Sequence, residues 1–144
     1  MNTLLDESDH KIMLLLQARG RIPVAQISKE ISMSQPAVKE RILKLEERGF
    51  ITGYTVRFDL SRLGRGTTAF IMMKTEHCQE LVDYCGQAAE VTELHRISGE
   101  YNYMIKVQTA SIEQLADFQD SLARMGSSKS MISMKTILED RVLL

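Results

Sequence analysis

The spacing of apolar residues changes near residue 49 of this chain, and that change limits the folds open to it. Before it, apolar residues recur every three or four positions in three short segments, which is the spacing of one helix face. After it, several segments alternate apolar and polar residues, as half-buried strands do. Short helices and alternating strands must each pack against a partner. We therefore predict an α+β chain whose first part is helical and whose second part is mixed.

Three helices are predicted in the first 60 residues. Asp6 is a suitable N-cap for the first helix, which should end near Gly20, and Ser34 is a suitable N-cap for the third. Pro36 is tolerated in the first turn of that third helix, and Gly49 stands where a helix-ending glycine is expected. The residues expected to face inward are Ile12, Leu15, Leu16, Val24, Ile27, Ile31, Val38, Ile42 and Leu45.

The segment 50–58 predicts an extended strand. Its apolar residues, which alternate with polar residues or glycine, are Phe50, Tyr54, Val56 and Phe58. The run Leu63-Gly64-Arg65-Gly66 that follows is typical of a linker. We therefore expect a first domain over 1–60, a linker over 61–66 and a second domain over 67–144.

The apolar spacing of the second domain predicts the order strand, helix, strand, strand, helix, strand. The expected strands are 67–75, 91–97, 101–107 and 132–138. The first helix should follow Cys78, and the second should begin with the capping box Ser111-x-x-Gln114 and end at Gly126. This βαββαβ order is that of the ferredoxin-like sandwich.

Composition places the chain among soluble globular proteins, with 44% apolar and 26% charged residues. No apolar run is long enough for a membrane helix, the chain start does not look like a secretory signal, and two cysteines suit a reducing compartment. We expect a cytoplasmic, nucleoid-associated protein. The net charge of −1 does not exclude nucleic acid, because residues 19–48 carry seven Lys and Arg against four Glu.

The second and third helices, joined by Ser32-Met33-Ser34, match a helix-turn-helix at about 24–43. Gln35, Ala37 and Lys39, with Glu40 as a further candidate, are expected to reach base edges in the major groove. The remaining cations of this region would contact phosphates. The full candidate DNA-binding set is Lys29, Ser34, Gln35, Pro36, Ala37, Lys39, Glu40, Arg41 and Lys44. Spacing alone leaves open an ordinary three-helix bundle with a solvated charged surface.

An ordered set of motifs resembles the leucine-responsive/asparagine-type (Lrp/AsnC) family of regulators. The motifs are Leu5-Asp6-x-x-Asp9-x-x-Ile12, Arg21-Ile22, Ile27-Ser28-Lys29, Ser34 with Pro36, Glu40-Arg41-Ile42-x-Lys44-Leu45-Glu46-x-x-Gly49-Phe50-Ile51-x-Gly53-Tyr54-Thr55, and Ser98-Gly99-Glu100-Tyr101-Asn102-Tyr103. The resemblance implies a transcription regulator that binds double-stranded DNA through the helix-turn-helix. It also implies a ferredoxin-like module that forms homodimers, often assembled into octamers, and binds amino acids between dimers.

The resemblance further implies that an effector site is lined by Gly99, Glu100, Tyr101, Asn102 and, on the last strand, Thr136. Glycine lets a backbone approach a ligand closely, and a carboxylate can pair with an α-ammonium group. Three positions depart from the family pattern. Asn102 stands where many members have Asp, Ser32 where a turn glycine is usual, and Pro23 where a serine commonly caps the second helix.

Two other functions remain open at this stage, an architectural DNA-binding protein without an effector and a small ferredoxin-like enzyme. The enzyme alternative rests on fold analogy alone, because the sequence contains no catalytic motif. We expect no cofactor and no metal ion. Cys78 and Cys85 are seven residues apart, which is not a zinc-ligand spacing, and we interpret them as core residues.

Overall fold

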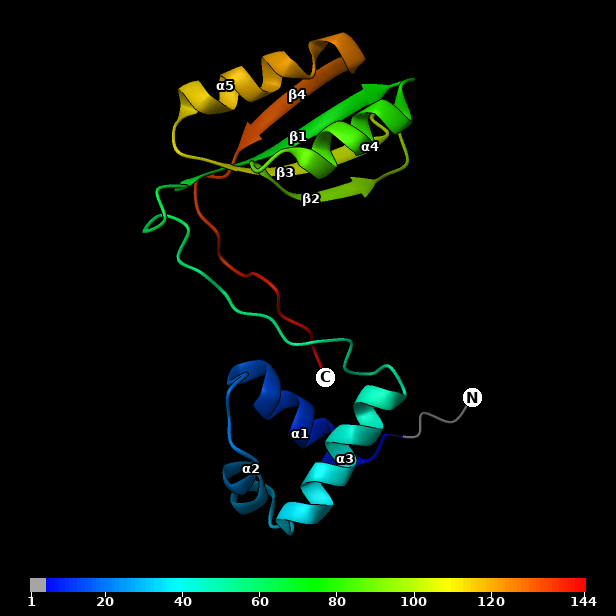
Figure 1. Ribbon diagram of the computed structural model, residues 1–144, viewed down its shortest axis with the longest axis vertical. Coiled ribbons are helices and arrows are strands. Elements are labelled where there is room, and N and C mark those ends of the chain that lie inside the picture. The colour runs from blue at the N-terminus through cyan, green and yellow to red at the C-terminus, as the bar shows by residue number, and fades with distance from the viewer. Residues whose placement is uncertain (1–4) are drawn as a thin grey trace. The chain divides into compact units, whose positions relative to one another are not determined.

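The computed structural model of the chain describes residues 5–144 (Figure 1). It divides into two compact units. The described residues up to Arg57 form the first unit together with Leu138–Leu144, and Phe58–Ile137 form the second. No helix in the described part of the chain is long and apolar enough to cross a membrane.

The first unit contains the three predicted helices. They are α1 (Glu7–Ala18), α2 (Val24–Ile31) and α3 (Gln35–Glu47). Their apolar faces meet in one core whose buried residues are Ile12, Met13, Ile27, Val38 and Leu45. The predicted three-helix arrangement is therefore confirmed.

Local capping explains where these helices begin and end. Asp6 and Asp9 form a reciprocal capping box at the start of α1, and the Ser34 hydroxyl accepts a hydrogen bond from the Ala37 backbone at the start of α3. Ser32 lies in the left-handed conformation, with φ of 57°, between α2 and α3. The Ser28 hydroxyl donates to the Met33 carbonyl and helps to hold this turn.

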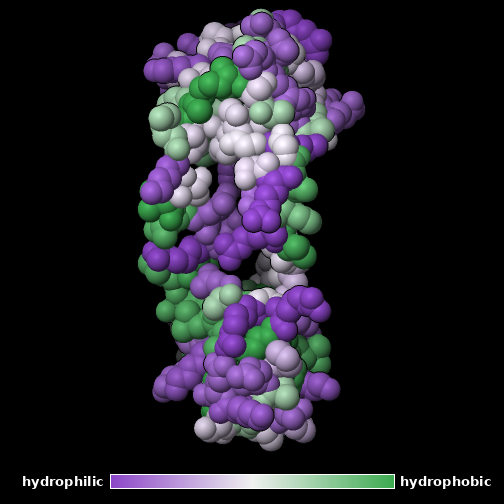
Figure 2. All heavy atoms as spheres, turned by 90° about the vertical axis from the view of Figure 1, so that its left-hand side faces the viewer, coloured by the Kyte–Doolittle hydropathy of each residue, from purple (hydrophilic) through white to green (hydrophobic). Residues whose placement is uncertain are grey.

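The strand predicted over 50–58 is wrong. The segment has no ladder partner among residues 5–144, and a strand needs a neighbour to satisfy its backbone. The backbone N–H groups of Phe50 and Ile51 bond to the Leu45 carbonyl and close the end of α3. Beyond that point the alternating side chains stay exposed, and hydrophobic side chains are visible along the stretches that connect the two units (Figure 2).

The second unit is a four-stranded antiparallel sheet with two helices on one face (Figure 1). Its elements are β1 (Thr67–Thr75), α4 (Cys78–Gln87), β2 (Val91–Arg96), β3 (Tyr103–Thr109), α5 (Ile112–Ser121), a short 3-10 turn (Ala123–Met125) and β4 (Gly126–Ile132). The strand order β2-β3-β1-β4 is that of the ferredoxin-like sandwich, so the predicted fold class is confirmed.

The core of the second unit lies between the sheet and the two helices. Its largest fully buried side chains are Ile71, Met73, Leu81, Ile105, Leu122 and Met125. Cys85 is buried in this core and Cys78 packs against it, which confirms the core interpretation of both cysteines. Burial raises the pKa of the Cys85 thiol to about 11, so it stays protonated near neutral pH.

The last strand lies earlier than predicted, at Gly126–Ile132 and not at 132–138. Apolar alternation did not reveal it, because its sequence is mostly Ser and Lys. β4 instead pairs with β1 over seven positions, and Gln119 of α5 bonds to Ser128 and Ser130 on its inner face. Gly126, predicted to end α5, begins this strand instead. The apolar side chain of Met134, beyond the strand, is 95% exposed.

The sheet face opposite the helices carries apolar and charged side chains. Side chains alternate across β1, so Ala69 and Ile71 face the helices whereas Phe70 and Met72 face the other side. Phe70 pairs in register with Met131 on β4 and Lys106 on β3, and Met72 pairs with Met104 on β3 and Lys129 on β4. Phe70, Met72 and Met104 are partly exposed on this face.

Candidate functional site

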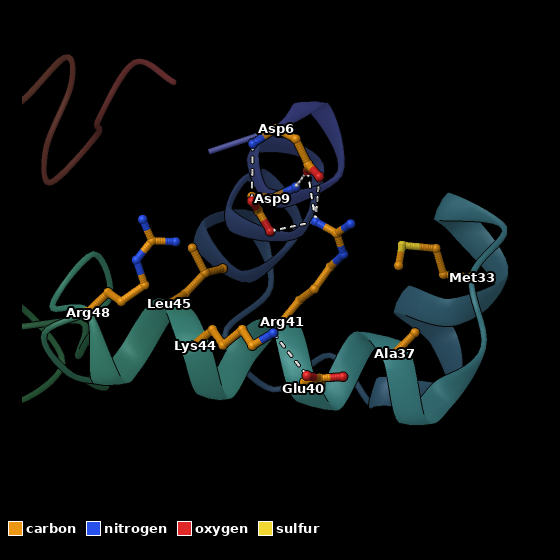
Figure 3. Close-up of a pocket in the computed structure, with 9 residues that line it drawn as sticks. All are labelled: Asp6, Asp9, Met33, Ala37, Glu40, Arg41, Lys44, Leu45 and Arg48. Carbon is orange, nitrogen blue, oxygen red and sulfur yellow. Dashed lines mark hydrogen bonds and ion pairs between the residues drawn. The ribbon is translucent and has the colours of Figure 1, made fainter. Parts of the chain in front are cut away.

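The helix-turn-helix places the predicted base-reading residues on two sides of α3. Gln35 and Lys39 are exposed and, being four residues apart, lie on one side. Ala37 and Glu40 line a groove of about 410 Å³ on another side, next to the start of α1 (Figure 3). The structure therefore does not bring the predicted set onto one surface.

The predicted phosphate-binding residues differ in what they contact. Lys44 pairs with Glu40 on the surface of α3, with Nζ 2.9 Å from Oε1, and holds the pKa of that carboxyl below its usual value. Lys29 and Lys39 are exposed and form no ion pair with the described residues. Exposed pairs are weak, so Lys44 can exchange Glu40 for a phosphate.

Arg41 differs from these lysines, because its guanidinium points toward α1 (Figure 3). Its Nη1 lies 2.8 Å from each carboxylate oxygen of Asp6 and 2.9 Å from Oδ1 of Asp9. Both carboxylates raise the Arg41 pKa. The side chain is 30% exposed, so Arg41 is partly enclosed within the unit.

Leu43 was missed by the sequence interpretation. It lies on α3 one turn after Lys39, and its residue surface is 51% exposed. An exposed apolar side chain on the recognition helix can contact a thymine methyl group. The available signal was that Leu43 falls outside the inward spacing of Val38, Ile42 and Leu45.

A second candidate site is an open hollow of about 560 Å³ in the second unit. The end of β1, the loop between β2 and β3, and the start of β4 form its walls. The residues that line it are Lys74, Thr75, Glu76, His77, Gly99, Glu100, Asn102, Ala123, Arg124, Met125, Gly126 and Ser127. It therefore contains side chains of both charges, as recognition of a zwitterion requires.

Three of the five predicted effector residues line this hollow, namely Gly99, Glu100 and Asn102. Tyr101 and Thr136 are not among the described residues that line it. Thr136 is exposed beyond the end of β4 because that strand lies earlier than predicted. The walls supplied by β1 and β4 were missed, since sequence spacing does not indicate which strand ends lie together.

Asn102 holds the loop to β1. Its Oδ1 accepts from the Thr75 backbone N–H at 3.0 Å, and its Nδ2 donates to the Thr75 carbonyl at 2.8 Å. Its own backbone N–H donates to the Met73 carbonyl. An aspartate could make only the accepting bond, so the departure from the family pattern has a structural use. Both polar atoms of the side chain are engaged with backbone and not directed at a ligand.

Within residues 5–144, no three His, Cys, Asp or Glu side chains gather where a metal ion could be held. The candidate functional features are the surface of α2 and α3 and the hollow beside β1. The first carries exposed cations and the second carries mixed charge.

Comparison with known proteins assigns both units. Residues 68–143 match the model of the Lrp/AsnC ligand binding domain, and residues 5–52 match a winged helix-turn-helix DNA-binding model. YezC, an uncharacterized HTH-type transcriptional regulator of Bacillus subtilis (strain 168), is 34% identical over 128 residues, covering 89% of this chain and 92% of YezC.

Solved structures agree with this assignment. LrpC of B. subtilis has the same fold, with a TM-score of 0.88 over 98% of this chain and 100% of LrpC, at 23% identity. A feast or famine regulatory protein from M. tuberculosis, complexed with L-methionine, has a TM-score of 0.86 at 25% identity, over 96% of this chain and 98% of that protein. The chain belongs to the Lrp/AsnC family of HTH-type transcriptional regulators.

Proposed function

We propose that the chain is a sequence-specific regulator that binds double-stranded DNA through its first unit and a small amino-acid effector through its second. The observation that carries the DNA-binding half is the exposed N-terminal end of α3, presented after a short turn from α2. A helix end in this setting enters the major groove. Such a regulator acts in the cytoplasm.

Base reading is assigned to the side of α3 that carries Gln35, Lys39 and Leu43. Gln35 can pair with adenine, Lys39 can donate to guanine, and Leu43 can contact a thymine methyl. Pro36 lies between these side chains in the first turn, where Ser34 caps the helix. Ala37 and Glu40, on the groove side, are secondary candidates.

Phosphate contacts are assigned to Lys29 and Lys44. Lys44→Ala should weaken binding to every duplex and reduce the slope of log Kd against log salt by about one. Lys135→Ala, which removes an exposed lysine outside the helical unit, should leave that slope unchanged. An unchanged slope in Lys44→Ala would remove Lys44 from the phosphate contacts.

The test of sequence-specific binding is selection of duplexes from a random pool by the full chain. We expect enrichment of paired half-sites about 34 Å apart, or a multiple of that, because a dimer presents two recognition helices. Recovery of a pool without any enriched site would contradict sequence specificity.

Effector binding is assigned to the hollow beside β1. Glu100 can pair with an α-ammonium group, and Lys74 or Arg124 can pair with a carboxylate. The L-methionine complex of the related M. tuberculosis protein supports this class of ligand. The loop residues Gly99 and Asn102 shape the site.

A melting screen of the full chain against the common amino acids tests this assignment. A ligand at 100 times its Kd adds about 2.7 kcal/mol to the free energy of unfolding. Glu100→Ala should abolish the stabilisation and leave duplex binding intact, whereas Asp117→Ala on the exposed surface of α5 should keep both. Stabilisation of Glu100→Ala by the same amino acid would contradict the role of Glu100.

Assembly into homodimers, and from them into larger oligomers such as octamers, is assigned to the second unit. A group of apolar side chains on the sheet face that the helices leave uncovered supports this proposal, because exposed apolar patches on soluble proteins mark association surfaces. Its contributing side chains are Phe70, Met72, Met104 and Met131.

An architectural DNA-binding protein without an effector is the second candidate. The engagement of Asn102 with the Thr75 backbone favours it, because both polar atoms of that side chain already have a hydrogen-bond partner in the protein. The melting screen separates the two functions. Failure of every amino acid to stabilise the full chain would favour the architectural candidate.

A further inference from the structure

Arg41 joins the recognition helix to the start of α1 by contacts that span more than thirty residues of sequence. Its Nη1 contacts Asp6 at 2.8 Å to each oxygen and Asp9 at 2.9 Å. The Asp9 side chain is 12% exposed and the Arg41 side chain 30%. Charge-assisted contacts of this kind are short and directional, and partial burial reduces their screening by solvent.

The two carboxylates are also held by backbone hydrogen bonds at the start of α1. The Asp6 backbone N–H donates to Asp9 Oδ2 at 3.1 Å, and the Asp9 backbone N–H donates to Asp6 Oδ1 at 2.9 Å. The capping box therefore ties both carboxylates to the first turn of α1. A guanidinium bound to both of them fixes the rotation of α3 relative to α1.

That rotation decides where the base-reading side chains lie. Gln35 and Lys39 are on the same rigid helix as Arg41, within two turns of it. Hydrogen bonds to base edges require side chains to be held within about 0.5 Å and 10–20°. A small rotation of α3 would therefore displace both side chains from the bases.

The charge balance argues against a phosphate contact for Arg41. Two carboxylates contact one guanidinium, so its charge is compensated within the first unit, and a phosphate would have to displace both of them. Lys44 is paired with the single carboxylate of Glu40 on the surface of α3.

We propose that Arg41 is a positioning residue, which Asp6 and Asp9 hold so that the recognition helix presents Gln35 and Lys39 to the bases, and that it does not contact phosphate. The proposal rests on the proposed DNA-binding function. The sequence predicted a phosphate contact for Arg41. The proposal replaces that role, because the Arg41 guanidinium is directed toward α1.

The test measures Kd of the full chain for the duplex enriched from the random pool and for an unrelated duplex of equal length, over a range of salt. Arg41→Gln should bind the enriched duplex about tenfold or more weakly, with the wild-type salt slope and a smaller preference over the unrelated duplex. Lys44→Ala, the matched control on α3, should lower the slope by about one and keep the preference. A slope lowered by one in Arg41→Gln, with equal loss on both duplexes, would overturn the proposal.

Asp9→Asn changes Kd for the enriched duplex in opposite directions under the two roles of Arg41, positioning and phosphate binding. If Arg41 is a positioning residue, Asp9→Asn weakens binding to the enriched duplex, and adding Arg41→Gln causes little further loss. If Arg41 binds phosphate, loss of a competing carboxylate tightens binding, which would overturn the proposal.

Arg41→Lys keeps the charge, but its Nζ lies one bond closer to the backbone than the Nη1 that makes all three contacts, and it covers the case in which Arg41→Gln does not fold. It should keep the wild-type salt slope and lose preference. Wild-type preference in Arg41→Lys would overturn the proposal. Circular dichroism at the assay temperature confirms that each variant is folded. If the wild-type chain binds no duplex, the proposed function itself fails and this inference fails with it.

Discussion

At the residue scale, the Asp6 carboxylate both stabilises the folded state and helps to hold α3 against α1 through Arg41. Its pKa lies below the ordinary value of 3.8, first because the Asp9 backbone N–H donates to it and then because Arg41 does. A carboxyl whose pKa falls on folding stabilises the folded state above its unfolded pKa. That stabilisation is lost as pH falls through the folded pKa.

The Asp6→Asn variant should therefore be less stable than the wild type at pH 7, by an amount that shrinks as pH falls below about 4. Asparagine retains the ability to cap α1, so the comparison isolates the charge. Urea unfolding of both chains at pH 7 and pH 3 measures the difference. A difference of equal size at the two pH values would show that the Asp6 charge does not stabilise the fold.

Residue identities predicted parts of the sites and missed others. Asp6 and Ser34 could be identified as caps because capping depends on local sequence alone. The Arg41 contact with Asp6 and Asp9 could not be predicted, since it depends on how α1 packs against α3. The hydrogen bonds of Asn102 could not be predicted either, because its partner Thr75 lies at the end of β1.

At the element scale, β4 is the least predictable part of the fold. Its sequence gives no apolar alternation, and its place beside β1 depends on Gly126. A Cβ atom on Gly126 would lie 2.1 Å from the Lys74 carbonyl oxygen, so only glycine fits without a backbone shift. The segment 50–58 is the converse case, because it alternates like a strand but has no partner among the described residues.

Gly126→Ala should lower the free energy of unfolding by about 1–3 kcal/mol or more, because the backbone must shift to admit the methyl group. Gly86→Ala, in α4, is the matched control, since no atom lies within 4 Å of its Cβ position. Alanine favours helix over glycine by up to about 1 kcal/mol, so the control should be neutral or stabilised. Equal unfolding midpoints for Gly126→Ala and the wild type would contradict the close packing of β4 on β1.

At the scale of the whole molecule, two small units depend on different means of stabilisation. The helical unit buries few large side chains and adds the contacts between Arg41 and α1. The sheet unit buries more and leaves a group of apolar side chains on its uncovered face. Assembly through that face would present several DNA-binding units together, which explains how a net charge of −1 is compatible with DNA binding.

Met72→Lys should shift the full chain to smaller oligomers in analytical ultracentrifugation, because it places a charge in the uncovered sheet face. Met134→Lys is the matched control, since Met134 is 95% exposed beyond β4. It should leave the oligomeric state unchanged. A Met72→Lys chain that sediments like the wild type would exclude this face as the association surface.

The most direct test of the central claim, that α3 reads base sequence, is the base preference of Gln35→Ala. Kd values for the enriched duplex and for its single-base variants should show a loss of about 1–3 kcal/mol of discrimination at one position, with the other positions unchanged. Equal weakening on every duplex, with all base preferences retained, would contradict base reading by Gln35 and the orientation of α3 on which this account depends.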